Sequence, residues 1–370
     1  MPAFRVSKAA VTALLAASVY PIAGHAEEDT IFPRVDVEIP MELENDYTAS
    51  SEDEDAEIND LFATIEPGIS VRFTKELSIE SSLVFEPVQD PDAGDDRFLE
   101  DHGLYAEEIF VNYETERFAA YAGKFNPTFG TAWDIAPGIF GTDLAEDYEI
   151  TERIGAGGAI KFGGDGFGAG DFGEHRLALN GFFADTTALS DSLITSRGEL
   201  DLDDGGPSNT EDLSSMSATL DGGNMPGVPV NYHLGVQFQE GGRGTPEDQT
   251  GYVVGLNGSY PLTPTITLEP MVENAYFEDF GGVQENRNYL TGGASLLYGP
   301  WNAAVSYTNR HVDPEGEDSF SDDQVQVSAG YAFANGLTLD AGYKYTEDAG
   351  THAHVIGALL TYNFAFSYPN

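Results

Sequence analysis

The stretch Arg34-Val-Asp-Val-Glu-Ile-Pro-Met-Glu-Leu-Glu44 alternates apolar and polar side chains residue by residue. The odd positions from Val35 to Leu43 are all apolar, and acids occupy most of the even positions. Because successive side chains of a β-strand point to opposite faces, this period of two predicts a strand with one apolar and one polar face. The pattern returns at 324–333 and 337–346, and about sixteen such segments follow one another from Val35 to the end of the chain.

These amphipathic segments predict an all-β protein, a transmembrane antiparallel β-barrel of about sixteen strands. The apolar faces would meet lipid, and the polar faces would line a water-filled interior. No stretch approaches the roughly 18 uninterrupted apolar residues of a spanning helix, so strands alone would have to cross the membrane. A soluble β-sandwich or a lipocalin-like barrel, with the apolar faces inward, is the alternative. The number and length of the segments favour the membrane barrel.

The connections between the segments are alternately long and acidic, then short. With the amino terminus in the periplasm, the connections after odd-numbered strands would be the external loops. These long connections are Asn45–Asp60, Pro87–Gly103, Pro127–Glu149, Thr186–Asp212, Glu240–Thr250, Glu278–Arg287, Val312–Asp323 and Glu347–His352. The expected turns at Gly163–Gly173 and Asp221–Pro229 are longer than such turns usually are, so fourteen or eighteen strands remain open.

The composition and the amino terminus limit the possible functions. Residues 1–26 look like a secretory signal peptide, with Arg5 and Lys8 before an apolar run and Gly24-His-Ala26 before the expected cleavage point, which leaves 27–370 as one barrel domain. The absence of cysteine excludes disulfides and thiol chemistry. With 16 bases against 63 acids and a formal net charge of −47, nucleic acid and anionic polymers are excluded as partners.

Three short motifs resemble those of the sixteen-stranded porins of Gram-negative outer membranes, of the general and phosphate-selective types. Tyr121–Gly130 looks like a porin strand end, and Gly357–Phe364 resembles the closing strand that the assembly machinery reads. Pro137-Gly-Ile-Phe-Gly-Thr-Asp143 is similar to the pattern on the third external loop, which in porins folds back into the barrel. The resemblance implies an outer-membrane barrel with an infolded third loop and a homotrimer. The acid excess argues against a basic pathway for phosphate.

The third long connection is the candidate pore constriction, because acids in a narrow wet pore attract cations. Its acids are Asp134, Asp143, Glu146 and Asp147, followed by Glu149. Parity on the neighbouring strands predicts bases that point into the lumen opposite these acids, since a base facing lipid near the midplane would cost about 2 to 4 kcal/mol. These pore-lining bases are Arg72, Lys124, Arg153, Lys161 and Arg176. The alternatives are scattered lumen charges and a solvated acidic loop.

The sequence therefore predicts a passive outer-membrane diffusion channel for small hydrophilic solutes and ions, with a preference for cations and with membrane lipid around it. Two alternatives stay open: a substrate-specific channel, and a non-conducting barrel that serves as a structural anchor or adhesin. No motif of a hydrolase or other enzyme is present, and no cofactor is expected. His352 and His354 share one strand face, but the sequence places no third metal ligand beside them.

Overall fold

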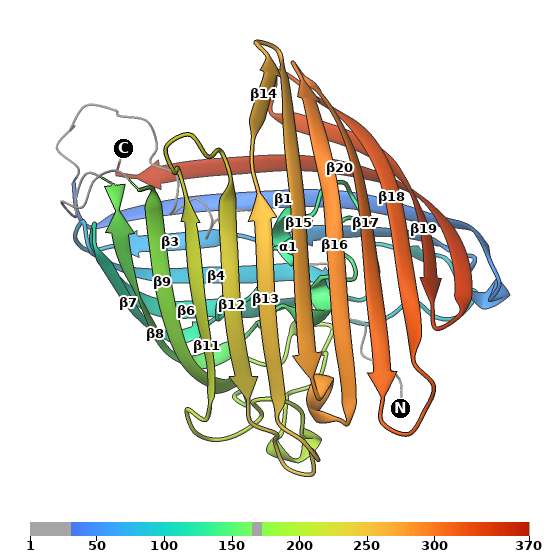
Figure 1. Cartoon of the computed structure of the whole chain (residues 1–370), viewed down its shortest axis with the longest axis horizontal. Helices are drawn as coiled ribbons and strands as arrows, with labels where there is room; N and C mark the ends of the chain where they lie inside the picture. Colours follow the sequence, from blue (N-terminus) through green and yellow to red (C-terminus); the bar gives the residue numbers. More distant parts are fainter. Residues whose placement is uncertain (1–30, 165–171, 370) are drawn as a thin grey trace.

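The computed structural model describes residues 31–164 and 172–369. The expected signal peptide and the centre of the expected turn at Gly163–Gly173 lie outside the described residues. The chain forms a closed antiparallel β-barrel of sixteen strands, which confirms the predicted fold class (Figure 1). Every pairing between neighbouring wall strands is antiparallel, and closure leaves no free sheet edge.

The first half of the wall runs through strands of very different length. These are β1 (Arg34–Ser51), β2 (Asn59–Ile65), β3 (Gly68–Arg72), β4 (Leu77–Pro87), β5 (Arg97–Phe98), β6 (His102–Glu114), β7 (Phe118–Phe125), β8 (Arg153–Gly163), β9 (Glu174–Ala184) and β10 (Leu193–Ile194). β2 and β3 are two halves of one wall strand, because Pro67 has no N–H to donate to the ladder and interrupts the pairing with β1. β5 and β10 are two-residue segments inside loops.

The second half contains the longer strands. These are β11 (Ser215–Gly223), β12 (Asn231–Gln239), β13 (Gln249–Asn257), β14 (Tyr260–Thr263), β15 (Ile266–Glu278), β16 (Glu285–Tyr298), β17 (Trp301–Pro314), β18 (Phe320–Ala332), β19 (Leu337–Asp348) and β20 (Thr351–Tyr368). β13 and β14 form one wall strand, since both pair with β15. β1 and β20 close the barrel through sixteen residue pairs, from Val35 opposite Tyr368 to Ser51 opposite Ala353.

The long and short connections lie at opposite ends of the barrel, which we call the long-loop end and the short-turn end. Loop 3 (126–152) joins β7 to β8 and folds back into the interior, where the helix α1 (Ala132–Ile135) lies inside the ring of strands (Figure 1). Loop 4 (185–214) joins β9 to β11. Short 3₁₀ helices also occur in the loops, at Glu54–Ala56, Glu146–Tyr148, Leu202–Asp204 and Phe280–Gly282. Within the described residues, no helix has the length and apolar character needed to cross a membrane.

Contacts with loop 3 identify the lumen-facing side of each strand, because directly opposite residues of paired strands share a face. Lys344 contacts Asp143 of loop 3 and lies opposite Val355 of β20, which lies opposite Thr48 of β1. Even-numbered residues of β1 therefore face the lumen up to this point. Consequently, the acids of 34–44 line the interior and its apolar residues face outward, as the alternation predicted.

Candidate pore constriction

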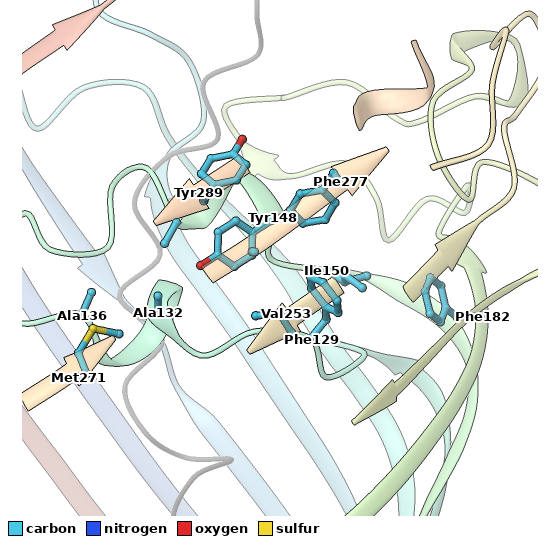
Figure 2. Packing of buried hydrophobic residues seen from close by; sticks show 12 residues of the cluster. Phe129, Ala132, Ala136, Tyr148, Ile150, Phe182, Val253, Met271, Phe277 and Tyr289 are labelled. Atoms are coloured by element: carbon cyan, nitrogen blue, oxygen red, sulfur yellow. The ribbon is translucent and has the colours of Figure 1, made fainter. Parts of the chain in front are cut away.

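Loop 3 packs against the inner wall through a buried aromatic cluster (Figure 2). Phe129 of loop 3 lies edge-on to Phe277 of β15, with 5.6 Å between ring centroids, and Tyr148 lies 5.1 Å from Tyr289 of β16. Phe182 of β9 belongs to the same cluster. Aromatic pairs in this geometry add to the free energy gained by removing apolar surface from water. The lumen is therefore apolar, and not water-filled, along this part of the wall.

Glu273 of β15 fixes the start of α1 with four hydrogen bonds. Its Oε2 accepts from the backbone N–H and the hydroxyl of Thr131, at 2.8 and 2.7 Å, and its Oε1 accepts from Ala132 N at 2.9 Å and the Tyr148 hydroxyl at 2.7 Å. Only 1% of Glu273 is exposed. A buried carboxylate is stabilised when donors saturate its oxygens, and here every donor belongs to loop 3.

Neutral side chains of the wall hold two further points of loop 3. His233 of β12 accepts a hydrogen bond from Gly130 N at Nε2, over 3.0 Å, while its Nδ1 lies 2.6 Å from Asp221. Gln326 of β18 donates to the Pro137 carbonyl at 2.7 Å. Both side chains therefore face the lumen and contact loop 3.

Two of the predicted constriction acids meet bases of the far wall. Asp143 lies 2.6 Å from Lys344 Nζ on β19. Asp147 lies 2.8 Å from Arg310 Nη1 on β17 and 3.8 Å from Arg287 on β16. None of these three bases was selected from the sequence, although parity alone puts Arg310 and Lys344 on the polar face. The ion pairs hold loop 3 against β16, β17 and β19.

The other two predicted acids, Asp134 and Glu146, lie near the carboxyl group of Glu149. Glu146 is buried and accepts a hydrogen bond from the Thr142 hydroxyl at 2.7 Å. Burial raises the pKa of Asp134 to about 6. The pKa of the neighbouring Glu149 is raised well above its usual range, first by burial and then by the carboxylates of Glu107 and Glu146. This side of loop 3 therefore faces other acids.

The wall opposite this side of loop 3 is acidic along its lumen face. Its strands are β1 to β4 and β6, and the register of β1 with β2, β3 and β20, and of β4 with β3 and β6, places the side chains. The acids are Asp36, Glu38, Glu42, Glu44, Glu80, Glu86 and Glu108, with Glu66 at the break between β2 and β3. Loop 3 and this wall thus present carboxylates to each other.

Four of the predicted bases occupy the lumen face but stand away from the loop acids. Arg72 lies 3.3 Å from Asp36, and Lys161 forms an ion pair with Glu114. Arg176 lies opposite Lys161, and all three bases are within a few residues of the short turns. Arg153 stands at the end of loop 3 and donates to the Thr151 carbonyl at 2.6 Å. The structure therefore does not bring these bases into one row opposite the acids.

Lys124 differs from the prediction, because it does not face the lumen. It lies opposite Ile109 and Ile154, on the outward side of β7, while Tyr121 faces inward and donates to Asn180 at 2.6 Å. The parity argument that placed Lys124 in the lumen implied that Tyr121 and Phe125, which have the opposite parity, face lipid. These rings instead face the part of the lumen that loop 3 fills. Loop 4 covers Lys124 from outside and leaves it 4% exposed.

The described residues contain no group of three or more His, Asp or Glu side chains arranged to hold a metal ion. His352 and His354 lie on the outward face of β20, opposite Glu347 and Tyr345 of β19, and their Nδ1 atoms contact the hydroxyls of Tyr345 and Tyr343 at 2.8 and 2.6 Å. The expectation that the protein uses no cofactor stays a prediction.

The fold is that of the porin-type outer-membrane channels. The chain is similar to OmpF of Salmonella typhi, solved in complex with daunomycin, with a TM-score of 0.60 and 12% identity over 89% of this chain and 97% of that one. It is also similar to the outer-membrane channel DcaP of Acinetobacter baumannii, with a TM-score of 0.56 and 11% identity over 92% and 100% of the two chains. A loop-deletion mutant of the outer-membrane protein OmpT of Vibrio cholerae gives a TM-score of 0.56 and 11% identity over 90% and 100%. No family model and no curated protein matches the sequence. At these identities the likeness establishes the fold alone.

Proposed function

We propose that the protein is a passive outer-membrane channel for small hydrophilic solutes and ions, with a preference for cations. The observation that carries the proposal is the division of charge around loop 3. Asp143 and Asp147 are neutralised by Lys344 and Arg310 where the loop meets the wall. On another side of the loop, the carboxylates of Asp134 and Glu146, and those of Glu66 and Glu107 of the wall, surround the carboxyl group of Glu149.

The electrostatics of such a passage favour cations for a general reason. Carboxylates on both sides of a narrow water-filled gap with low-dielectric walls add their potentials, so the local concentration of cations rises and that of anions falls. Two of the lumen bases near the short-turn end, Arg72 and Lys161, each have an acid as a partner. They would offset the negative potential only weakly.

The location and the assembly belong to the same proposal. We expect export by the 1–26 segment, insertion into the outer membrane with lipid around the outward faces, and a homotrimer. DcaP, which shares the fold, is an outer-membrane channel. The outer-membrane protein OmpT of Vibrio cholerae has been solved as a trimer, at a TM-score of 0.50 and 11% identity over 89% and 99% of the two chains. We expect no enzymatic activity.

The test is the reversal potential of the purified protein in planar bilayers under a salt gradient. Stable conductance steps with a cation-selective reversal potential are expected, and Asp134→Asn should shift that potential toward zero because it removes a negative charge from loop 3. Glu317→Gln is the matched control, since Glu317 is an exposed acid in the connection between β17 and β18. Folded barrels that do not conduct would contradict the channel and favour an anchor or adhesin.

A further inference from the structure

The barrel wall is incomplete next to β6, at the point where loop 3 leaves it. β7 pairs with β6 only from Glu114 to Ile109, although β6 continues to His102. Loop 4 occupies the vacant edge, where β10 pairs Leu193 with Leu104 and Ile194 with Gly103. Loop 4 is thus a part of the wall beside the two ends of loop 3.

The two ends of loop 3 are bonded to each other and to β6. Glu152 N donates to Asn126 Oδ1 at 2.8 Å, and Asn126 N donates to Glu108 Oε1 at 2.9 Å. Asp185, the first residue of loop 4, donates from its backbone N–H to the Glu152 carbonyl at 3.3 Å. The beginning of loop 4 therefore continues the same hydrogen-bonded junction.

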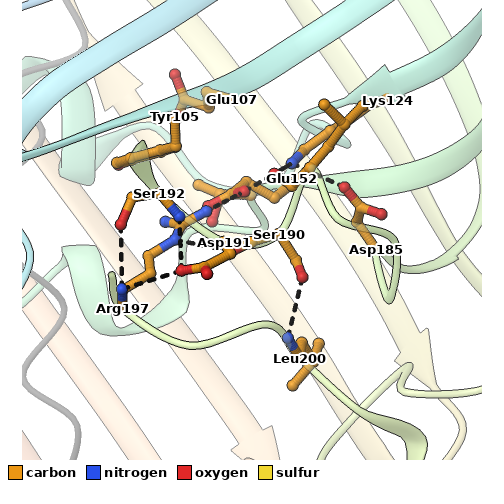
Figure 3. Close-up of polar contacts among 12 residues, drawn as sticks. Tyr105, Glu107, Lys124, Glu152, Asp185, Ser190, Asp191, Ser192, Arg197 and Leu200 are labelled. Carbon is orange, nitrogen blue, oxygen red and sulfur yellow. Dashed lines mark hydrogen bonds and ion pairs between the residues drawn. The ribbon is translucent and has the colours of Figure 1, made fainter. Parts of the chain in front are cut away.

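Two bases and two acids meet at this junction, and we call them the root network: Lys124, Glu152, Asp185 and Arg197 (Figure 3). Oε2 of Glu152 accepts from Lys124 Nζ at 2.8 Å and from Arg197 Nη2 at 2.6 Å. Lys124 Nζ also lies 2.8 Å from Asp185. The charges of the network cancel, which is the condition under which buried charges are tolerated.

Loop 4 holds Arg197 in a defined position. Oδ1 of Asp191 accepts from the backbone N–H groups of Ser192, Arg197 and Gly198, at 2.7, 3.1 and 3.0 Å. The Arg197 guanidinium stacks on the ring of Tyr105 of β6 at 3.7 Å. A guanidinium fixed by stacking loses little further entropy when it binds a carboxylate.

We propose that loop 4 positions the constriction: Arg197 and Asp185 hold the ends of loop 3 through Glu152 and Lys124, so that loop 4 determines how rigidly loop 3 stands in the lumen. The inference rests on the proposed channel function. Removal of the Arg197 charge leaves two acids against one base in a buried site, and the ends of loop 3 must then open to admit water or a counterion.

The test is hydrogen exchange of the folded barrel in detergent, with single-channel recording of the same samples. In Arg197→Met, the amides of Asn126, Glu152 and Asp185 should exchange about tenfold faster, since each tenfold corresponds to about 1.4 kcal/mol of local stability. The control is Arg243→Met, which removes an exposed ion pair with Asp203 in the same region and should leave these amides unchanged. Glu152→Gln serves as a second variant if Arg197→Met does not fold.

A positioning role also predicts a change in the channel that a purely structural role would not produce. Arg197→Met should increase the rate of brief channel closures several-fold. The fraction of folded barrel, detected by its faster migration on an unheated gel, and the unitary conductance should stay the same. Unchanged exchange at the three amides in both variants would overturn the proposal. A wild-type barrel that does not conduct would contradict the channel function, while the exchange result would still decide whether loop 4 holds loop 3.

Discussion

Replacing Glu273 with Gln should release α1 from the wall. The amide offers one oxygen and one NH₂ group in place of two acceptor oxygens, and each Glu273 oxygen receives one backbone N–H, from Thr131 or from Ala132. The hydroxyls of Thr131 and Tyr148 can rotate to accept a hydrogen bond, but a backbone N–H cannot. Whichever way the amide lies, one backbone donor therefore stays buried without a partner.

The magnitude follows from this count. The loss of one charge-assisted hydrogen bond, with its donor left unsatisfied, costs about 2 to 3 kcal/mol. At about 1.4 kcal/mol per tenfold, the population in which this part of loop 3 leaves the wall should rise about 30-fold to 100-fold. The remaining anchors of loop 3 are unaffected, so the opening is local.

A thiol introduced by Ala145→Cys can report this opening, because the chain has no native cysteine and Ala145 is completely buried in the cluster that contains Tyr148. Labelling by a charged, membrane-impermeant maleimide should accelerate in proportion to the open population. Glu269→Gln is the control, since Glu269 lies on the same face of β15 and accepts one hydrogen bond, from Ser259 at 3.1 Å. Equal labelling rates with Glu273 and with Gln at that position would refute the anchoring role.

Three further predictions use the same contacts. Burial raises the pKa of Asp134 to about 6, so its carboxylate is charged above that pH and neutral below it. The preference of the channel for cations should therefore fall as the pH drops through 6. The reversal potential of Asp134→Asn should show no such change with pH. Arg310→Met should lower the unfolding temperature of the barrel, measured as the temperature at which the faster-migrating folded band disappears from a gel. The fully buried Asp322 then loses its ion pair with Arg310, at a cost of about 3 to 5 kcal/mol; an unchanged unfolding temperature would contradict this ion pair. Gly138→Ala should accelerate labelling of the Ala145→Cys reporter, because Gly138 has φ of +93° and a Cβ there would lie 1.9 Å from Gln326 Nε2. Gly292→Ala, where the nearest atom is 3.8 Å away, should not change it.

The strands were predictable because each one is determined by the alternation of apolar and polar residues within a short segment. Each wall strand has lipid on one side and the interior on the other, so an alternation such as that of 34–44 identifies the strand and both of its faces. The sixteen strands and the infolded third loop agree with the structure. The alternation of long and short connections fails at the last pair, because only Ala349 and Gly350 join β19 to β20 where Glu347–His352 was expected to be a long loop. The break at Pro67 also follows from one residue, although the sequence analysis did not use it.

The contacts of the constriction were less predictable, because the path of loop 3 through the lumen depends on residues far apart in the sequence. The rule that apolar residues face outward assumes a water-filled lumen, and it failed at β7, where Tyr121 and Phe125 face the part of the interior that loop 3 fills. Lys124 was placed in the lumen for the same reason. Arg310 and Lys344 could be assigned to the polar face from sequence, but which acids they neutralise depends on where residues 126–152 cross the barrel.

The pairing of β1 with β20 has a consequence for biogenesis. It joins the first and the last wall strands over sixteen residue pairs, whereas β6 and β7 share six. The strand that completes the cylinder is thus synthesised after all the other wall strands, and until it pairs the sheet is open, with unpaired backbone groups on two edges. Since those edges cannot be exposed to hydrocarbon, a chaperone or an insertion machine must occupy them until Tyr368 reaches Val35. The sixteen residue pairs of this final ladder favour the closed cylinder over the open sheet.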